Sequence, residues 1–359
     1  MTLMPIERIP DWEQRLARQD AFWRREILDR PVVIMACGAE TPAAPWPAER
    51  AYASQRERWF DVERAVEGAR AAALNTAYLG DALPTACPNL GPEVFSAFFG
   101  TELEYSEATA WAIPNLHDWA DADTLQFSED NIYYRRLWAL TEGLLEGGQG
   151  LYYTGLTDFH PGGDALVAFR DPLLMNMDML EAPDEVKALL AATYSVYFDV
   201  FDRFYTRLRE AGQACTAWAG IASAQKWYVP SNDFSCMISP AMFDEFFLPG
   251  IAEECRRLEA SIYHLDGPNA LRHLDSLLAI PELNAIQWVY GAGNGRATDW
   301  MPVYRKCQAA GKGIQLWAER DELDTIMDVL RPEGVWLGVS GIRTREEGEA
   351  VLKRVMRWT

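Results

Sequence analysis

The sequence predicts a single (β/α)8 barrel with an N-terminal helical extension. Short apolar runs end in polar or glycine residues and are followed by helical periodicity, and about eight such runs alternate along the chain. They are marked by Val32, Asn75, Tyr152, Ala217, Ile262, Ile286, Leu316 and Trp336. An open doubly wound sheet is the alternative, but no GxGxxG motif opens a helix after the first strand, so no nucleotide cofactor is expected.

We expect residues 1–30 to form the extension and residues 31–359 the barrel. The first half should contain a helix at 11–29, a buried strand at 31–36, a proline-rich loop at 41–47, a helix at 51–74 and a strand at 76–81. The loop at 41–47 is long enough to fold over the barrel mouth. A short helix at 93–100, an irregular segment at 106–121 and a helix at 131–146 follow.

The second half repeats the alternation more clearly. It should contain strands at 151–155, 215–220, 262–266, 285–289, 313–318 and 335–339, with helices at 164–170, 171–180, 183–211, 269–278 and 345–358. Another helix opens at Ser239, which is followed by proline, the residue pair favoured at the N-cap and the first helical position.

Composition excludes several classes of protein. With 33 Lys and Arg against 53 Asp and Glu, the net charge of -20 repels nucleic acids and anionic membranes. Six scattered cysteines without a CxxC pair are typical of a reducing cytoplasm. The N-terminus lacks an apolar signal region, and no 18 apolar residues run together. We therefore expect a cytoplasmic globular protein.

Polar residues at three strand ends are the main candidates for chemistry, because barrel enzymes place their active sites there. His264 and Asp266 alternate on one strand, so their side chains share a face. Asp158 and His160 have the same spacing and are candidates for proton transfer, and Glu319 ends a third strand as a candidate acid–base group or ligand. In each case a structural hydrogen bond, ion pair or turn is the alternative.

Further residues are candidates for binding a substrate by stacking or hydrogen bonding. They are Tyr78, Trp111, Trp227, Asp233, Gln287, Trp288 and Trp317, and packing or turn formation is the alternative for each. Acidic and aromatic groups together hint at a cationic or sugar-like ligand. No Walker loop, HExxH motif or Ser-His-Asp order is present.

Several segments carry a resemblance to a known superfamily. DRPVV at 29–33, TDFHPGGDALVAFRDP at 157–172, APDEV at 182–186, DFSCMISPAMFDEFFLPGI at 233–251 and YHLDG at 263–267 occur in the order found in uroporphyrinogen decarboxylase-like barrels. The chain resembles this superfamily over nearly its whole length. True uroporphyrinogen decarboxylases carry arginines after the first strand, whereas this chain reads Met35-Ala36-Cys37-Gly38. Haem-pathway decarboxylation is therefore rejected.

The chain is most similar to the branch of corrinoid-dependent methyltransferases, among members described as trimethylamine corrinoid protein-like. The resemblance implies zinc held by an HxC motif and a further cysteine near the last strand. Here Asp266 replaces the first cysteine, and Gly338 to Gly341 contains none. Carboxylates make a harder site than thiolates, which argues against thiol alkylation. His264, Asp266 and Glu319 are the expected ligands of zinc or another divalent metal.

Three functions follow from these observations. The resemblance implies methyl transfer or demethylation of a small polar methylated substrate, with the corrinoid carried by a partner protein. The alternative is a metal-independent lyase or hydrolase that uses His and carboxylate pairs. A third reading is a non-catalytic barrel that binds a small ligand. We allow for a homodimer.

Overall fold

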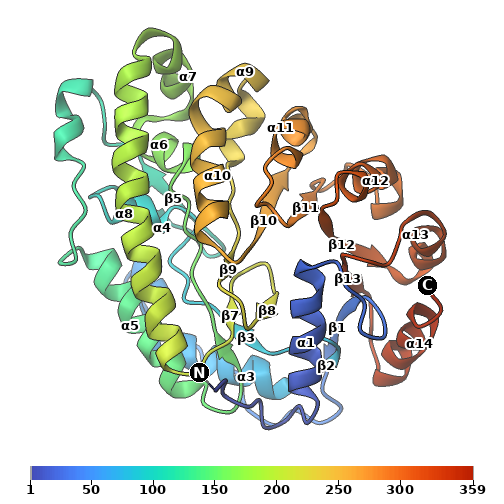
Figure 1. Cartoon of the computed structure of the whole chain (residues 1–359). Helices are drawn as coiled ribbons and strands as arrows, with labels where there is room; N and C mark the ends of the chain where they lie inside the picture. Colours follow the sequence, from blue (N-terminus) through green and yellow to red (C-terminus); the bar gives the residue numbers. More distant parts are fainter. Residues whose placement is uncertain (1, 359) are drawn as a thin grey trace.

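A computed structural model describes residues 2–358 and shows an α/β fold (Figure 1). A seven-stranded sheet has the order β2-β1-β13-β12-β11-β10-β9, and helices α10 to α14 form an arc outside it. The strands of this sheet are β1 Val32–Gly38, β2 Thr76–Gly80, β9 Trp227–Tyr228, β10 Ala260–Asp266, β11 Ala285–Val289, β12 Gly313–Glu319 and β13 Val335–Ser340.

Three two-stranded pairs accompany the sheet. They are β3 Thr85–Ala86 with β6 Tyr153–Thr154, β4 Glu102–Tyr105 with β5 Ala110–Ile113, and β7 Cys215–Thr216 with β8 Ala222–Ser223. Beyond β6, the Leu156 N–H donates to the Thr216 carbonyl at 2.9 Å, which ties β6 to β7. Within residues 2–358, however, no strand ladder joins β2 to β3 or β7 to β9, so the ladders do not close a barrel.

The helices differ in length and packing role. Their bounds are α1 Trp12–Trp23, α2 Gln55–Trp59, α3 Val62–Asn75, α4 Val94–Ala97, α5 Ile132–Gly147, α6 Gly163–Arg170, α7 Pro172–Glu181, α8 Pro183–Glu210, α9 Pro240–Met242, α10 Leu248–Arg257, α11 Leu274–Leu278, α12 Met301–Ala309, α13 Leu323–Val329 and α14 Arg345–Val355. A turn of π-helix, Phe243–Phe247, separates α9 from α10, and short 3-10 turns lie at 119–124, 233–237, 268–273, 297–300 and 320–322. None of these described helices is long and apolar enough to cross a membrane.

Strand β2 differs from the prediction in its direction. It pairs antiparallel with β1, whereas the other ladders of the seven-stranded sheet are parallel. Strand β2 begins at Thr76, directly after α3 ends at Asn75, so there is no loop in which the chain could reverse. The parallel strand expected at this point is instead β3, whose two residues pair with β6.

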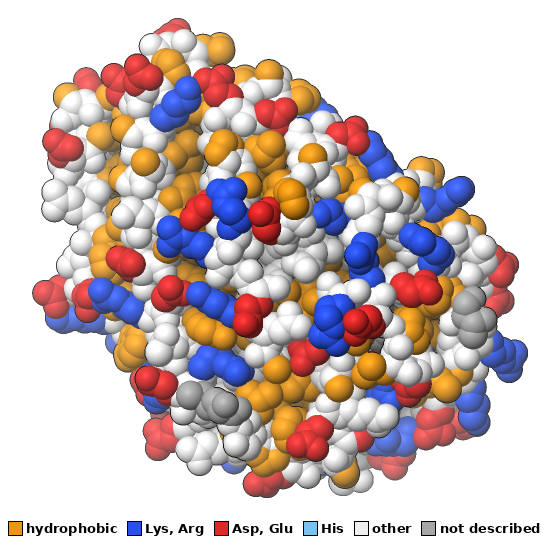
Figure 2. Space-filling view, viewed as in Figure 1, with side chains coloured by type: hydrophobic (Ala, Val, Ile, Leu, Met, Phe, Trp, Pro, Cys, Tyr) orange, Lys and Arg blue, Asp and Glu red, His pale blue; other side chains and the backbone are white. Residues whose placement is uncertain are grey.

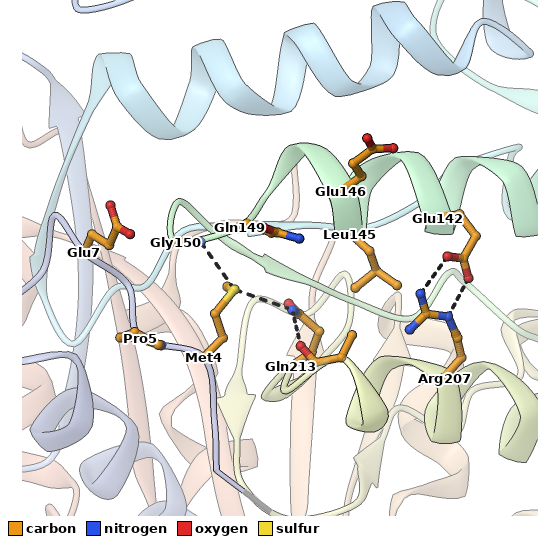
Figure 3. Close-up of a pocket in the computed structure, with 11 residues that line it drawn as sticks. Met4, Pro5, Glu7, Glu142, Leu145, Glu146, Gln149, Gly150, Arg207 and Gln213 are labelled. Carbon is orange, nitrogen blue, oxygen red and sulfur yellow. Dashed lines mark hydrogen bonds and ion pairs between the residues drawn. The ribbon is translucent and has the colours of Figure 1, made fainter.

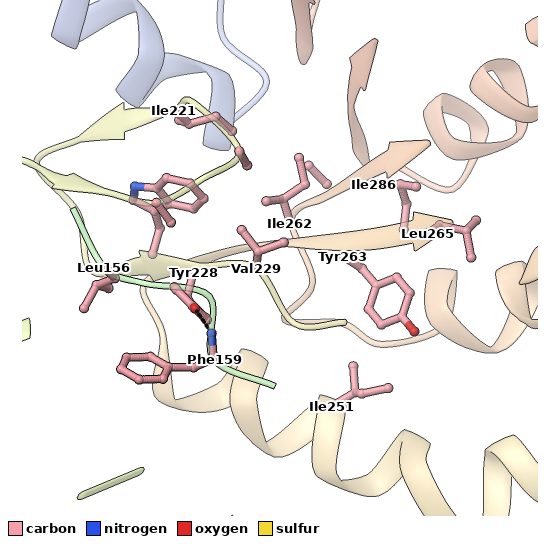
Figure 4. Close-up of a cluster of buried hydrophobic side chains, with 14 of the residues drawn as sticks. Leu156, Phe159, Ile221, Tyr228, Val229, Ile251, Ile262, Tyr263, Leu265 and Ile286 are labelled. Carbon is pink, nitrogen blue, oxygen red and sulfur yellow. Dashed lines mark hydrogen bonds between the residues drawn. The ribbon is translucent and has the colours of Figure 1, made fainter. Parts of the chain in front are cut away.

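Apolar side chains fill the space between the sheet and the helices. Strand β10 contributes Tyr263 and Leu265, and β11 contributes Ile286, all buried on the face opposite His264 (Figure 4). Tyr228 is also buried, and its hydroxyl accepts from the Phe159 N–H at 2.7 Å and donates to the Thr157 carbonyl at 2.5 Å. A core residue thereby fixes the backbone immediately before His160.

The N-terminal region is tied to the seven-stranded sheet by a buried ion cluster. Helix α1 contacts β1, β8 and β13. Asp81, which has no exposed surface, pairs with Arg18 at 3.0 Å and with Arg30, and accepts from the Val33 N–H at 2.9 Å. The Asp29-Arg30 pair that opens DRPVV is therefore part of a structural anchor: Asp29 holds Arg18 at 2.7 Å.

Charges of both signs are interspersed on the face that carries α1, with no large patch of one sign there (Figure 2). The proline-rich loop at 41–47 lies against α3. Asn75 accepts from the Ala43 and Ala44 N–H groups and donates to the Ala44 carbonyl, and Pro47 contacts Gly68.

Candidate metal and acid–base site

Three polar side chains converge where β10 ends. The ligand atoms of Asp233, His264 and Asp266 all lie within 4.8 Å of one another. His264 and Asp266 point the same way because residues two apart on a strand share a face. Asp233 comes from the turn after β9, which β10 holds in place: the His264 N–H donates to the Pro230 carbonyl at 3.0 Å.

His264 is held on two sides. Its Nδ1 lies 2.5 Å from Oε1 of Gln287, the neighbouring residue on β11, and its ring meets Trp218 edge to face at 4.9 Å. Its other nitrogen, Nε2, lies 3.8 Å from Asp233. One ring nitrogen is therefore bound by the protein and the other faces the two carboxylates.

A second cluster surrounds His160. The imidazole is buried, with Nε2 2.5 Å from Asp158, Nδ1 3.5 Å from Asp164, and the Ser231 hydroxyl on the Nδ1 side. Burial alone would lower the pKa of His160, but the charges of Asp158, Asp164 and Asp233 outweigh it and raise the pKa to about 10. His160 is therefore an imidazolium at neutral pH and can donate a proton there but not accept one.

Asp164 connects the two clusters. It lies in the first turn of α6, and its carboxylate accepts from the N–H groups of Asp233 and Phe234 at 3.1 and 2.9 Å. The preceding residue is Gly163, and a Cβ at that position would lie 2.5 Å from the side-chain amide of Asn232. The close approach of α6 to the 232–234 turn therefore depends on glycine at position 163.

The protonation of Asp233 is also shifted. Burial is the largest cause and, with the charges of Asp164 and Asp266, raises the pKa of Asp233 to about 6. The charges of His264 and His160 oppose the rise. Because 55% of its side chain is exposed, water screens part of this effect. Asp233 is thus a carboxylate that can exchange protons near neutral pH.

The structure changes the expected ligand set. Glu319 ends β12 with its side chain 69% exposed, pairs with Arg296 at 3.1 Å and caps the turn at 320–322. Within residues 2–358, the cluster of His and acidic side chains that could hold a metal contains Asp233 in place of Glu319. Glu319, the third ligand expected from the sequence, lies outside this group and pairs with Arg296 instead.

Two of the predicted binding residues lie at the site, and a third, Trp317, lies on the same face of the sheet. Asp233 and Gln287 contact or approach His264 directly. Trp317 is half exposed, lies over Gly338 and meets Trp336 at 5.6 Å. It stands on the same face of β12 as Gln315 and Glu319, toward the end of the strand.

The other four lie elsewhere. Trp227 is fully buried and donates to the Cys215 carbonyl at 2.8 Å, and Trp288 is buried against Trp300, on the face of β11 opposite Gln287. Trp111 lies on the β4–β5 hairpin, where it donates to Glu104 at 3.2 Å. Tyr78 packs with the N-terminal segment. These four side chains therefore lie away from the group formed by Asp233, His264 and Asp266.

Two hollows lie away from Asp233, His264 and Asp266. One of about 730 Å³ lies between the N-terminal segment and helices α5 and α8, where Arg207 pairs with Glu142 and the Met4 sulfur accepts from Gly150 (Figure 3). Another of about 880 Å³ is lined by Tyr78, the N-terminal segment and the start of α14. Neither contains Asp233, His264 or Asp266.

Comparison with known proteins supports the fold. No protein-family model and no curated protein matches this sequence. Its fold is similar to that of a methyltransferase. That protein, a methyltransferase from Methanosarcina mazei, aligns with a TM-score of 0.57 and 14% identity over 95% of this chain and 98% of its own. At this identity the likeness shows a shared fold.

Sequence reasoning missed three residues that complete the site: Trp218, Ser231 and Gln315. Gln315 alternates with Trp317 and Glu319 on β12, so the two-residue period of a strand could have found it. Trp218 lies on the turn between β7 and β8, and only the packing of that hairpin brings it to His264. Nothing in the local sequence signals that contact.

Proposed function

We propose that this chain is an enzyme that binds a divalent metal ion through Asp233, His264 and Asp266 and catalyses methyl transfer or demethylation of a small polar methylated substrate. The observation that carries the proposal is the convergence of one imidazole nitrogen and two carboxylates within 4.8 Å where β10 ends. Barrel enzymes build their active sites at this end of their strands.

The donor set suits a metal. Metal–ligand bonds of about 2.0–2.2 Å place neighbouring ligand atoms roughly 3–3.5 Å apart, close to the 3.8 Å between His264 Nε2 and Asp233. Three protein ligands leave positions open for substrate, as in catalytic sites. Bound there, a divalent ion would act as a Lewis acid on a substrate oxygen or nitrogen. One imidazole and two carboxylates can bind zinc, manganese or iron, and they suit a soft ion such as Cu(I) poorly.

The fold we infer is the (β/α)8 barrel. Its wall would consist of β1, β3, β6, β7 and β10 to β13, with β9 beside β10. The β3–β6 ladder, the hydrogen bond from Leu156 to Thr216 and the likeness to the methyltransferase fold support this arrangement.

The protein groups have distinct roles in this proposal. His160 donates a proton to a leaving group, because Asp158 and Asp164 keep it charged. Asp233 accepts or holds a proton when it is not bound to metal. Trp218 and Trp317 provide aromatic surface for the substrate and limit access of water. A corrinoid protein is the proposed methyl acceptor, an assignment that the sequence resemblance implies.

A second function is favoured by the two shifted pKa values. The pKa of His160 is raised to about 10 and the pKa of Asp233 to about 6. The site therefore presents His160 as an acid and Asp233 as a base at neutral pH. Such a pair could serve a lyase or hydrolase without metal. The two functions differ in their dependence on metal, which gives a direct test.

Metal analysis of the purified protein tests the proposal. We expect close to one equivalent of a divalent metal in the wild type after incubation with zinc or manganese, and loss of most of it in His264→Ala and Asp233→Ala. His117→Ala, which changes an exposed histidine outside the site, should bind as the wild type does. No metal in the folded wild type would refute the metal site, and turnover that survives chelation would favour the lyase or hydrolase.

A further inference from the structure

A row of polar groups crosses the inner face of the sheet and ends at His264. The Ala219 carbonyl accepts from Gln315 Nε2 at 2.8 Å, Gln315 Oε1 accepts from Gln287 Nε2 at 2.6 Å, and Gln287 Oε1 lies 2.5 Å from His264 Nδ1. Gln315 is 1% exposed and Gln287 is 7% exposed. Water therefore has little access with which to replace these contacts.

The strand register creates this row. His264 pairs with Gln287 between β10 and β11, and Gln287 pairs with Gln315 between β11 and β12. Parallel strands in register place these three side chains side by side on one face. Ala219 reaches the end of the row because it lies on the tight turn between β7 and β8.

The backbone carbonyl gives the row a direction. A carbonyl oxygen only accepts hydrogen bonds, so the Gln315 atom facing Ala219 must be its NH2 group. The Gln315 oxygen then faces Gln287, which must present its own NH2 group, so the Gln287 oxygen faces His264. This oxygen also only accepts, so His264 Nδ1 must carry a hydrogen. In the neutral ring, the lone pair is then on Nε2, the nitrogen that faces Asp233.

We propose that Gln287 and Gln315 form a tautomer relay that keeps Nδ1 of His264 protonated and leaves Nε2 free to bind a divalent cation. Both are positioning residues, because each acts through another side chain. The part concerning the cation rests on the proposed function, whereas the part concerning the tautomer does not. Groups hydrogen-bonded to metal-binding histidines commonly fix the ring in this way.

The tautomer can be observed directly by NMR of protein labelled with 15N at histidine. The chain has four histidines, so the spectrum of a His264→Ala variant assigns the signals of His264. At about pH 9, well above the ordinary imidazole pKa of about 6.5, we expect the wild-type ring to show hydrogen on Nδ1 and none on Nε2. A His264 ring with hydrogen on Nε2 would overturn the proposal.

Two substitutions test the relay. Gln315→Met removes the group that orients Gln287, so we expect the Nε2-protonated form of His264 to appear. Gln287→Met removes the acceptor itself and should have the larger effect. Gln308→Met is the matched control, because Gln308 is also buried but bonds to the Arg331 backbone on the α12 side. If Gln315→Met and Gln287→Met fold and leave the His264 tautomer as in the wild type, the relay is refuted.

Zinc titration by calorimetry separates this proposal from the proposed function. Loss of an outer partner of a ligating histidine commonly weakens metal binding about ten- to a hundredfold, and we expect a loss in that range for Gln287→Met. Unchanged zinc affinity in that variant would overturn the cation part of the proposal. A wild type with the expected tautomer but no zinc binding would refute the metal site while leaving the tautomer relay intact.

Discussion

The buried carboxyl of Glu254 should make the stability of this protein depend on pH in a defined window. Glu254 lies on α10 with 2% of its surface exposed, and Tyr194 donates to one of its oxygens at 3.2 Å. Burial raises its pKa from 4.5 to about 8, although hydrogen bonds from Tyr194 and Tyr197 oppose the rise. The folded protein therefore keeps this proton at pH values where the unfolded chain has lost it.

The size and sign of the effect follow from the two pKa values. Below 4.5 both states hold the proton, and above about 8 both have lost it, so the free energy of unfolding falls as pH rises between these limits. Each pH unit is worth about 1.4 kcal/mol, so the whole window contributes on the order of 5 kcal/mol. Glu254→Gln replaces the neutral acid with a neutral amide and removes this dependence.

Urea unfolding at several pH values measures the effect. The stability of Glu254→Gln relative to the wild type should rise steadily from about pH 5 to about pH 8 and then level off. Glu253→Gln is the control, since Glu253 pairs with Arg256 and Arg257, which lower its pKa below the window. A difference between Glu254→Gln and wild type that stays constant with pH would refute the reasoning.

Two further changes test the structural framework. Asp81→Asn leaves Arg30 buried without a carboxylate partner and Arg18 with Asp29 alone, and should lower the free energy of unfolding by about 3–5 kcal/mol in urea titrations. Asp321→Asn, which removes an exposed partner of Arg296, should change the free energy of unfolding little. Tyr228→Phe removes the hydroxyl that bonds residues 157 and 159, so amide exchange at Phe159 should accelerate; unchanged exchange there would show that other contacts hold this loop.

Strands with a long apolar run were predictable from the sequence, and very short ones were not. The run at 285–289 appears in the structure with the same bounds as β11. By contrast, β3 and β9 contain two residues each, too few for any alternation to show. The direction of β2 follows from the direct succession of α3 and β2, with no loop between them. Composition does not reveal this feature.

The candidate site was only partly predictable for a related reason. His264 and Asp266 were found because strand alternation places them on one face, and this information is local. Asp233 was recognised as a binding candidate, but its place between the two histidine clusters depends on contacts with α6 and β10 that are distant in sequence. Glu319 satisfied the local rule and was still displaced, because Arg296 offers a partner at the rim.

The pairing of the first strand with the last has a consequence for synthesis of the protein. Val32 on β1 lies opposite Trp336 on β13, so two neighbouring strands of the sheet join segments about 300 residues apart. As the chain leaves the ribosome, the edge of β1 that pairs with β13 stays without its partner until nearly all other residues have been synthesised. Such an edge can pair with the wrong chain, so production of this protein should be sensitive to the supply of chaperones during translation.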